Sequence, residues 1–222
     1  MELIEAIKSR KSIRGYKPTP VSREIIAEIL EVASRAPSGM NCQPWEFTVL
    51  GGKVLDDLRQ ALQTQFLSGV AINHDFPWTP LTGVYRKRQL EVGIALYQLL
   101  GIRREDTEKK NQWLTNVRRA FDAPNLIIVS IDEVLFGNSY ALFALGAVMQ
   151  TIALTALDFG LGTCLLAAVM EYPQVVRQVT GIPDSKKLAC SIAIGYPDWD
   201  FPANKLQTTR EPVENITTWL GV

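Results

Sequence analysis

The sequence predicts an α+β fold in which a mixed central sheet lies between layers of helices. Short segments rich in β-branched residues alternate with longer segments of helical period, a pattern typical of strands separated by the helices that cover them. Residues 125–131 are almost continuously apolar, as expected for a central strand covered on both faces. Because 47% of its 222 residues are hydrophobic, the chain can bury one core, so we predict a single domain over residues 1–222.

The elements before the central strand are predicted from apolar spacing and from residues that begin or end helices. Residues 3–7 carry one apolar stripe of a short helix, and Ser22 is a suitable N-cap for a second helix that runs to about Arg35. The segment 46–50 predicts a buried strand that ends at Gly51-Gly52. Further helices are predicted over residues 54–66, 84–100 and 104–120, and residues 67–83 are predicted to form a mobile aromatic loop.

The second half of the chain contains the most apolar helix. Residues 140–159 are hydrophobic on most sides, and Gly160 is suited to the C-terminal cap. Such a helix belongs in the centre, and a monomer of this size would bury it with difficulty. The remaining predicted elements are a strand over 163–166, a helix over 172–179, a strand over 188–194 and a tail from Pro197 that wraps another surface.

Composition argues against several classes of function. The 23 basic and 23 acidic side chains cancel, which argues against nucleic acid or an anionic membrane as the partner. No apolar run is expected to reach the roughly 20 residues of a spanning helix, and the N-terminus has no signal-peptide pattern, so we predict a cytoplasmic protein. Cys42, Cys164 and Cys190 have no paired spacing and His74 is the single histidine, so we predict no disulfide, metal site or catalytic triad.

The most informative segment is the cationic run near the N-terminus. Residues 8–17 contain five cationic side chains and no carboxylate. In an extended conformation the alternate residues Arg10, Ser12 and Arg14 point to one side. Guanidinium groups bind phosphate through paired, charge-assisted hydrogen bonds, so the run predicts a site for a phosphate-bearing cofactor. A solvated basic surface is the alternative interpretation.

A second distinctive segment follows the second predicted helix. Residues 36–45 contain two prolines, a glycine and three short polar side chains, Ser38, Asn41 and Gln43. These amide and hydroxyl groups suit the donor and acceptor edge of a heterocycle. A polar turn ahead of a strand is the alternative. The chain has no Walker A pattern, and residues 160–165 lack the third glycine of a dinucleotide fingerprint, so a bound cofactor is expected to supply the chemistry.

Several separated motifs occur together in one order along nearly the whole chain. They are residues 10–14, residues 36–45, Tyr85-Arg86-Lys87-Arg88, Phe121-Asp122-Ala123-Pro124, Gly160-Leu161-Gly162-Thr163-Cys164, Gly195-Tyr196-Pro197-Asp198, Asn204 and Thr208-Thr209-Arg210. Together they resemble the FMN-dependent nitroreductase family. The resemblance implies a three-layer fold and a homodimer. In that dimer the long apolar helix would lie at the subunit interface, the C-terminal tail would embrace the partner, and FMN would bind between the subunits.

The resemblance also implies the binding site. Arg10, Ser12 and Arg210 would hold the FMN phosphate, and Arg14 would face the pyrimidine end, where a cation stabilises the reduced state. Residues of the 36–45 segment would come from the partner subunit, and the backbone of 165–167 would lie near flavin N5. The implied cofactor-binding residues are Arg10, Lys11, Ser12, Arg14, Pro37, Ser38, Asn41, Gln43, Leu165, Leu166, Ala167, Lys205 and Arg210.

The implied activity is that of an NAD(P)H oxidoreductase. NADH or NADPH would donate hydride at flavin N5 and a nitroaromatic, quinone or similar electron-poor ring would then take the electrons in a ping-pong cycle, with no catalytic side chain. Phe76, Trp78 and Tyr85 are candidates for lining the substrate pocket, with core packing as the alternative. The same fold also hosts reductive dehalogenation and oxygen-dependent flavin chemistry, and a non-catalytic FMN-binding or storage module is a further alternative.

Overall fold

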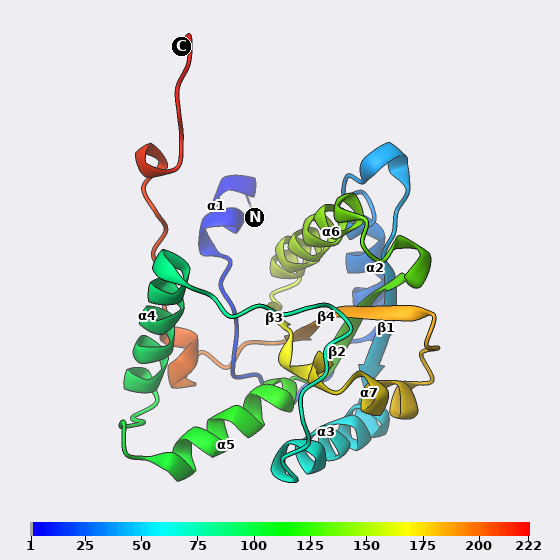
Figure 1. Ribbon diagram of the computed structural model, residues 1–222, viewed down its shortest axis with the longest axis vertical. Coiled ribbons are helices and arrows are strands. Elements are labelled where there is room, and N and C mark those ends of the chain that lie inside the picture. The colour runs from blue at the N-terminus through cyan, green and yellow to red at the C-terminus, as the bar shows by residue number, and fades with distance from the viewer. Residues whose placement is uncertain (1) are drawn as a thin grey trace.

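The computed structural model describes residues 2–222 and centres on a four-stranded sheet (Figure 1). Its spatial order is β1-β2-β4-β3. The strands are β1 (Glu46–Gly51), β2 (Asn125–Asp132), β3 (Gly162–Leu166) and β4 (Lys186–Gly195). The helices are α1 (Leu3–Ser9), α2 (Arg23–Ala33), α3 (Gly52–Leu67), α4 (Gly83–Leu99), α5 (Thr107–Arg118), α6 (Ser139–Asp158) and α7 (Pro173–Thr180).

Strand β2 shows why the sheet is covered on both faces. Its side chains alternate: Leu126 and Ile128 belong to the core on the α3 and α7 side, whereas Ile127 belongs to the core on the α2 and α6 side. All three are buried. Because successive side chains of a strand point to opposite faces, a continuous apolar run requires a helical layer on each side. The predicted α+β class and the sheet between helical layers are therefore confirmed.

The pairing within the sheet is antiparallel throughout the four strands, which differs from the mixed pairing that was expected. Strands β2 and β3 flank helix α6 and run in the same direction, as a strand, helix, strand sequence predicts. However, β4 lies between them and pairs with both. Within residues 2–222, parallel pairing is limited to the isolated bridge between Ser12 and Thr163.

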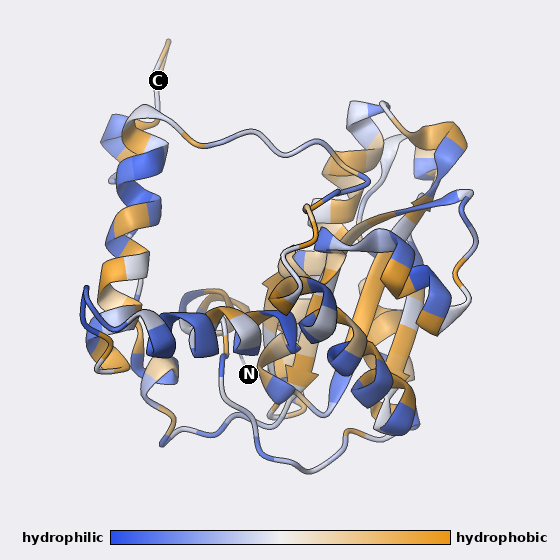
Figure 2. Cartoon of the chain, turned by 60° about the horizontal axis from the view of Figure 1, so that its bottom comes forward, coloured by the Kyte–Doolittle hydropathy of each residue, from blue (hydrophilic) through white to orange (hydrophobic). Residues whose placement is uncertain are grey.

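Helices α4 and α5 form an arm beside the sheet (Figures 1 and 2). The first half of α4 is exposed, and only Leu96 is buried within this helix. Leu96 packs with Ala203 and Leu206 of the C-terminal segment. Arg88 also forms an ion pair with Glu211, with 2.5 Å between the nitrogen and the oxygen. The position of α4 therefore depends on the C-terminal segment.

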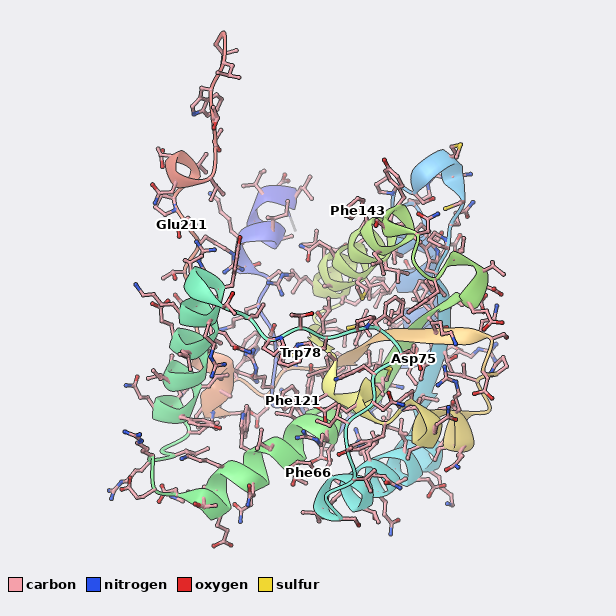
Figure 3. The ribbon with its side chains drawn as sticks, in the orientation of Figure 1. Phe66, Asp75, Trp78, Phe121, Phe143 and Glu211 are labelled. Carbon is pink, nitrogen blue, oxygen red and sulfur yellow. The ribbon has the colours of Figure 1, made fainter. Side chains whose placement is uncertain are left out.

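Helix α6 packs one side on the sheet and leaves apolar side chains exposed on the other. Ala144, Val148 and Ile152 are buried, whereas Tyr140 and Phe143 are exposed, and Figure 3 labels Phe143 on this helix. By length and composition, Ser139–Asp158 is long and apolar enough to cross a membrane. The expectation that no run would reach this length was wrong, because an apolar helix of a folded protein can have the same length and composition as a spanning helix.

The first predicted helix is formed, but most of its apolar side chains are not buried in the core. Helix α1 forms over the predicted residues, but Leu3, Ile4 and Ile7 are exposed and Ala6 is the buried residue of the helix. A single chain therefore leaves two apolar surfaces uncovered, one on α1 and one on α6.

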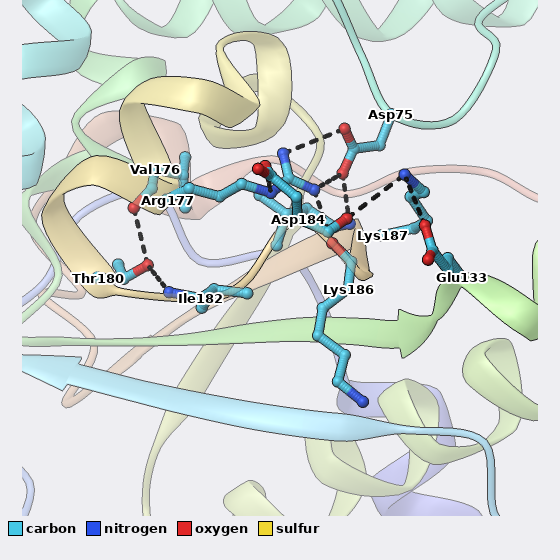
Figure 4. A network of polar contacts seen from close by, with 10 residues as sticks. Asp75, Glu133, Val176, Arg177, Thr180, Ile182, Asp184, Lys186 and Lys187 are labelled. Carbon is cyan, nitrogen blue, oxygen red and sulfur yellow. Dashed lines mark hydrogen bonds and ion pairs between the residues drawn. The ribbon is translucent and has the colours of Figure 1, made fainter.

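The loop between α3 and α4 has no helix or strand, as predicted, but its first half is anchored (Figure 4). The Asp75 carboxylate lies 2.6 Å from Arg177 Nη2 and accepts a hydrogen bond of 2.8 Å from the Leu188 backbone N–H. The Asn73 N–H donates to the Glu171 carbonyl at 3.0 Å. The mobile aromatic loop that the sequence predicts is therefore fastened by Asn73 to Glu171 and by Asp75 to α7 and β4.

Candidate functional site

The cationic run, residues 8–17, begins at the end of α1 and then passes beside β3, where Ser12 forms a bridge with Thr163. Arg10 is the C-cap residue of α1, and the Ile13 N–H donates to the Thr163 carbonyl at 2.9 Å. The Ile13 side chain is buried, whereas Ser12 and Arg14 are partly exposed. This alternation agrees with the prediction that even-numbered residues of the run share one side.

A cavity of about 740 Å³ joins this run to the C-terminal segment. Four cationic side chains line it and no carboxylate of the described residues does. The lining residues are Ile7, Lys8, Ser9, Arg10, Lys11, Trp199, Gln207, Thr208 and Arg210. The tertiary structure therefore brings Arg10, Lys11 and Arg210 together from the two ends of the chain, as the predicted site requires.

Local contacts orient the cations of this cavity. The Lys11 ammonium lies 5.3 Å from the centre of the Trp199 ring, within the range of a cation–π contact. Arg210 Nη1 donates to the Thr208 hydroxyl and to the Thr209 carbonyl, both at 2.8 Å. These contacts leave further guanidinium and ammonium donors for a ligand, because Arg carries five N–H donors and Lys carries three.

Arg14 lies on the β3 side of the run, close to two neutral acids. Burial raises the pKa of the Cys164 thiol, an effect that Arg14 and a hydrogen bond with Ser12 oppose. Burial also raises the pKa of the Tyr16 phenol well above its usual value, and Cys164 adds to this shift. Both groups therefore stay protonated at neutral pH, so neither cancels the positive charge of Arg14.

The predicted apolar edge next to flavin N5 is partly exposed. Leu165 is 40% exposed and Ala167 is exposed, whereas Leu166 is buried. Alternation along β3 explains this pattern, because neighbouring side chains point to opposite faces. Leu165 and Ala167 can therefore contact a ligand directly, and Leu166 can contribute only its backbone. Its carbonyl already accepts a hydrogen bond of 2.9 Å from the Ser191 hydroxyl.

The polar segment after α2 does not join the cationic cavity within one chain. It contains the short 3₁₀ helix η1 (Gly39–Asn41), which lies beyond α6 and away from α1 (Figure 1). Its side chains are satisfied locally: the Gln43 N–H donates to the Ser38 hydroxyl at 3.0 Å, and Gln43 Nε2 donates to the Asn41 carbonyl at 3.1 Å. Met40, Asn41 and Gln43 have positive φ angles, and Pro37 is exposed.

The three candidate aromatic residues occupy different environments. Phe76 is half-buried and packs on Phe136 with ring centres 5.2 Å apart, which is core packing rather than a pocket wall. Trp78 and Tyr85 are both exposed. Trp78 lies on the part of the α3–α4 loop that leads to α4 (Figure 3). Lys205 is exposed and does not line the cationic cavity that contains Arg10 and Arg210.

Sequence reasoning missed two residues of the site as binding or supporting groups. Trp199 lines the cavity and contacts Lys11. Asn204 was noted only as part of the family motif, but it is buried and hydrogen-bonds the backbone of Arg14. An indole and an amide in a proline-rich tail were the available signals, and neither indicates by itself which distant segment it meets.

The cavity fits the phosphate end of FMN. Its excess of cationic side chains matches a dianionic phosphate, for which charge-assisted hydrogen bonds are the strongest protein contacts. The hydroxyl group of Thr208 adds a neutral donor at the same wall. Arg14 does not line this cavity and follows Ile13, whose N–H bonds to Thr163 of β3, so it fits the more distant heterocycle.

Comparisons with known proteins agree with this geometry. The model of the nitroreductase family matches residues 7–196. A 4-nitrobenzoate reductase from Pseudomonas putida is 32% identical over 222 residues, covering 97% of this chain and 94% of that protein. The chain is also similar to the crystal structure of the FMN- and NADPH-dependent nitroreductase NfnB from Sphingopyxis sp. strain HMH, with a TM-score of 0.95, 29% identity and 100% of both chains covered.

A second solved structure leads to the same family. The FMN-dependent nitroreductase NfnB from Mycobacterium smegmatis, in complex with NADPH, has a TM-score of 0.91 and 28% identity, covering 98% of this chain and 97% of that one. Three findings agree: the family model matches most of the chain, the relatives match over nearly their whole length, and the fold is the same. The chain belongs to the nitroreductase family.

Proposed function

We propose that this protein is an FMN-dependent NAD(P)H oxidoreductase that reduces nitroaromatic compounds, quinones or similar electron-poor aromatic acceptors. The observation that carries the proposal is the cationic cavity that joins Arg10 and Lys11 to Arg210 without a carboxylate among its described lining residues. The similar protein from Sphingopyxis is described as FMN- and NADPH-dependent, and the one from Pseudomonas putida as a 4-nitrobenzoate reductase. Both descriptions support the same activity here.

In this proposal the side chains bind and orient rather than react. Arg10, Ser12 and Arg210 hold the phosphate, and Lys11 contributes a further cation. When bound, FMN supplies two-electron redox chemistry that no amino-acid side chain provides. Arg14 holds a fixed positive charge at the pyrimidine end, which favours the electron-rich state of the ring. Leu165 and Ala167 provide an apolar edge that excludes water beside the ring.

The proposed active form is a homodimer in which each chain is a single domain over residues 1–222. Two observations support it. The polar segment 37–43 lies away from the cationic cavity of its own chain, so its contact with FMN requires a second copy. The apolar side chains of α1 and α6, and Ile216, Trp219 and Leu220 of the tail, are exposed in one chain. The expected compartment is the cytoplasm, where its three free cysteines remain reduced.

The test is the visible absorption spectrum of the purified protein, followed by anaerobic addition of NADH and then NADPH. We expect a bound flavin spectrum that bleaches with one or both nicotinamides and returns when 4-nitrobenzoate or a quinone is added. A flavin that stays oxidised would contradict the reductase proposal and favour an FMN-binding module. Reoxidation by halogenated aromatics or oxygen, but not by nitroaromatics, would instead favour dehalogenation or oxygen-dependent chemistry.

A further inference from the structure

Asn204 lies beneath the cationic run and is almost completely buried, with 1% of its surface exposed. Its side-chain oxygen accepts a hydrogen bond of 2.6 Å from the Arg14 backbone N–H. Its side-chain nitrogen donates to the carbonyls of Gly15 and Asp198, both at 2.7 Å. The amide therefore uses its acceptor and both of its donors, and it joins the segment around Arg14 to the segment around Asp198.

The backbone at Arg14 and Gly15 needs this support, because neither residue belongs to a helix or a strand. The nearest sheet-like contacts are the isolated bridges of Ser12 with Thr163 and of Tyr16 with Pro197. Between these bridges the Asp198 N–H donates to the Gly15 carbonyl at 3.0 Å. Hydrogen bonds from Asn204 and Asp198 thus take the place that a ladder would have in a strand.

A close packing contact makes the same connection more specific. Residues 202–205 form the short 3₁₀ helix η5, which carries Asn204 and follows Phe201. The Phe201 ring lies against Gly15 so closely that a Cβ atom there would collide with it. Gly15 therefore allows η5 to approach the cationic run, and this approach brings the Asn204 amide within reach of the Arg14 backbone.

The direction of the Arg14 side chain depends on this backbone. Its Nη1 donates to the Ser12 carbonyl at 3.3 Å, so the guanidinium group folds back along the run toward Ser12. Rotation of the Arg14 peptide would move the guanidinium group, since this side chain forms no ion pair with the other described residues.

We propose that Asn204 is a positioning residue that fixes the backbone of Arg14 and thereby aims its guanidinium group at the pyrimidine end of FMN. This inference rests on the proposed FMN site. An asparagine is required because the position faces one N–H and two carbonyl groups. Aspartate keeps the acceptor but has no donor, and alanine leaves a backbone N–H and two carbonyls without this partner.

The test compares Asn204→Ala and Asn204→Asp with Asn125→Ala in the full-length protein. Asn125 is a matched control, because it is also a buried asparagine and accepts a hydrogen bond of 2.9 Å from the Val21 N–H, but it lies on β2. For each variant we would measure the melting temperature of the apoprotein, the FMN dissociation constant by fluorescence quenching, and the midpoint potential of the bound flavin.

We expect both Asn204 variants to raise the FMN dissociation constant roughly tenfold, as loss of an oriented hydrogen bond predicts. We also expect a lower midpoint potential, and the lowest for Asn204→Asp, which adds a negative charge near Arg14. Asn125→Ala should lower the melting temperature while its dissociation constant stays within about twofold of wild type. Equal effects of Asn204→Ala and Asn125→Ala on affinity and potential would overturn the inference.

A second measurement separates positioning from general damage. If Asn204 acts through Arg14, then adding Asn204→Ala to Arg14→Ala should change the midpoint potential no further, because the two effects are coupled. Full additivity of the Asn204→Ala and Arg14→Ala effects on the potential would contradict the inference. Wild-type protein that binds no FMN would instead contradict the proposed function itself.

Discussion

The guanidinium groups of Arg10 and Arg210 carry two of the four positive charges that line the cationic cavity. Arg210 is exposed and its hydrogen bonds are to its own neighbours, Thr208 and Thr209. Arg10 follows the last turn of α1. Neither residue belongs to the hydrophobic core, so their removal affects ligand binding more than folding.

Replacement of Arg210 by alanine should therefore weaken FMN binding with little change in stability. Loss of a charge-assisted contact of about 1.5 to 3 kcal/mol corresponds to a roughly ten- to hundredfold higher dissociation constant. The dissociation constant would be measured by flavin fluorescence on apoprotein. Arg104→Ala is the control, because Arg104 is exposed and lies outside the cavity. An unchanged affinity in Arg210→Ala would contradict its place in the site.

A second residue-scale prediction concerns alkaline pH. Burial raises the pKa of the Cys190 thiol from its usual 9.0 to about 11. The folded state therefore holds this proton more tightly than the unfolded chain. The corresponding stability is fully present below pH 9 and is lost as the pH rises through about 11, by roughly 2 to 3 kcal/mol. Urea unfolding between pH 8 and 11 should show a shallower decline for Cys190→Ala, and an identical slope would contradict this assignment.

At the scale of elements, α7 is joined to the aromatic loop through a buried ion pair. Arg177 on α7 is buried and its guanidinium group meets the Asp75 carboxylate of the loop, while Asp184 lies 3.3 Å away on the solvent side. Arg177 Nη2 also donates to the Lys186 carbonyl at the start of β4 at 2.6 Å. One side chain thus connects a helix, a loop and the edge of a strand (Figure 4).

Removal of Asp75 should destabilise the protein far more than removal of Asp184. Asp75→Ala leaves the Arg177 charge buried without its main partner, which costs about 3 to 5 kcal/mol. Asp184 has a side chain that is 84% exposed, so Asp184→Ala should cost less than about 1 kcal/mol. Urea unfolding at neutral pH measures both free energies. Similar losses for the two variants would show that burial of the pair does not determine its contribution.

Other elements show what local patterns can and cannot indicate. The Ser22 hydroxyl accepts a hydrogen bond of 3.3 Å from the Ile25 N–H, which confirms the predicted cap of α2. Gly160 follows the last residues of α6 with φ of +68°, as expected for a glycine that ends a helix. The predicted burial of β1 is only partly right, because this strand lies at the edge and its burial differs from residue to residue. Local sequence defines a strand but not its place in the sheet.

At the scale of the whole molecule, a single chain exposes apolar side chains that the proposed dimer would bury. Phe143 on α6 is 69% exposed, and the α6 face around it is apolar. The C-terminal segment extends away from the rest of the chain (Figure 1). These features agree with a homodimer whose interface includes α6.

Substitution of Phe143 by glutamate should therefore produce monomers. A buried charge without a partner opposes association strongly, whereas the same change at the surface has little effect. Light scattering after size-exclusion chromatography would measure the mass, which should fall from two chains to one. Val134→Glu is the control, since Val134 is 82% exposed but lies on the 3₁₀ turn Glu133–Leu135. A monomeric wild type, or a Phe143→Glu variant that stays dimeric with full FMN affinity, would contradict this interface.

The sequence by itself determined the elements, the two-sided burial of β2 and the cationic run, because these depend on periods of two or 3.6 residues and on neighbouring charges. Only the tertiary structure placed β4 between β2 and β3, fastened the aromatic loop through Asp75, and brought Arg210 to Arg10. It also revealed Asn204 as the support of Arg14. These pairings join segments far apart in the chain, and their geometry follows from packing of the whole core rather than from any local pattern.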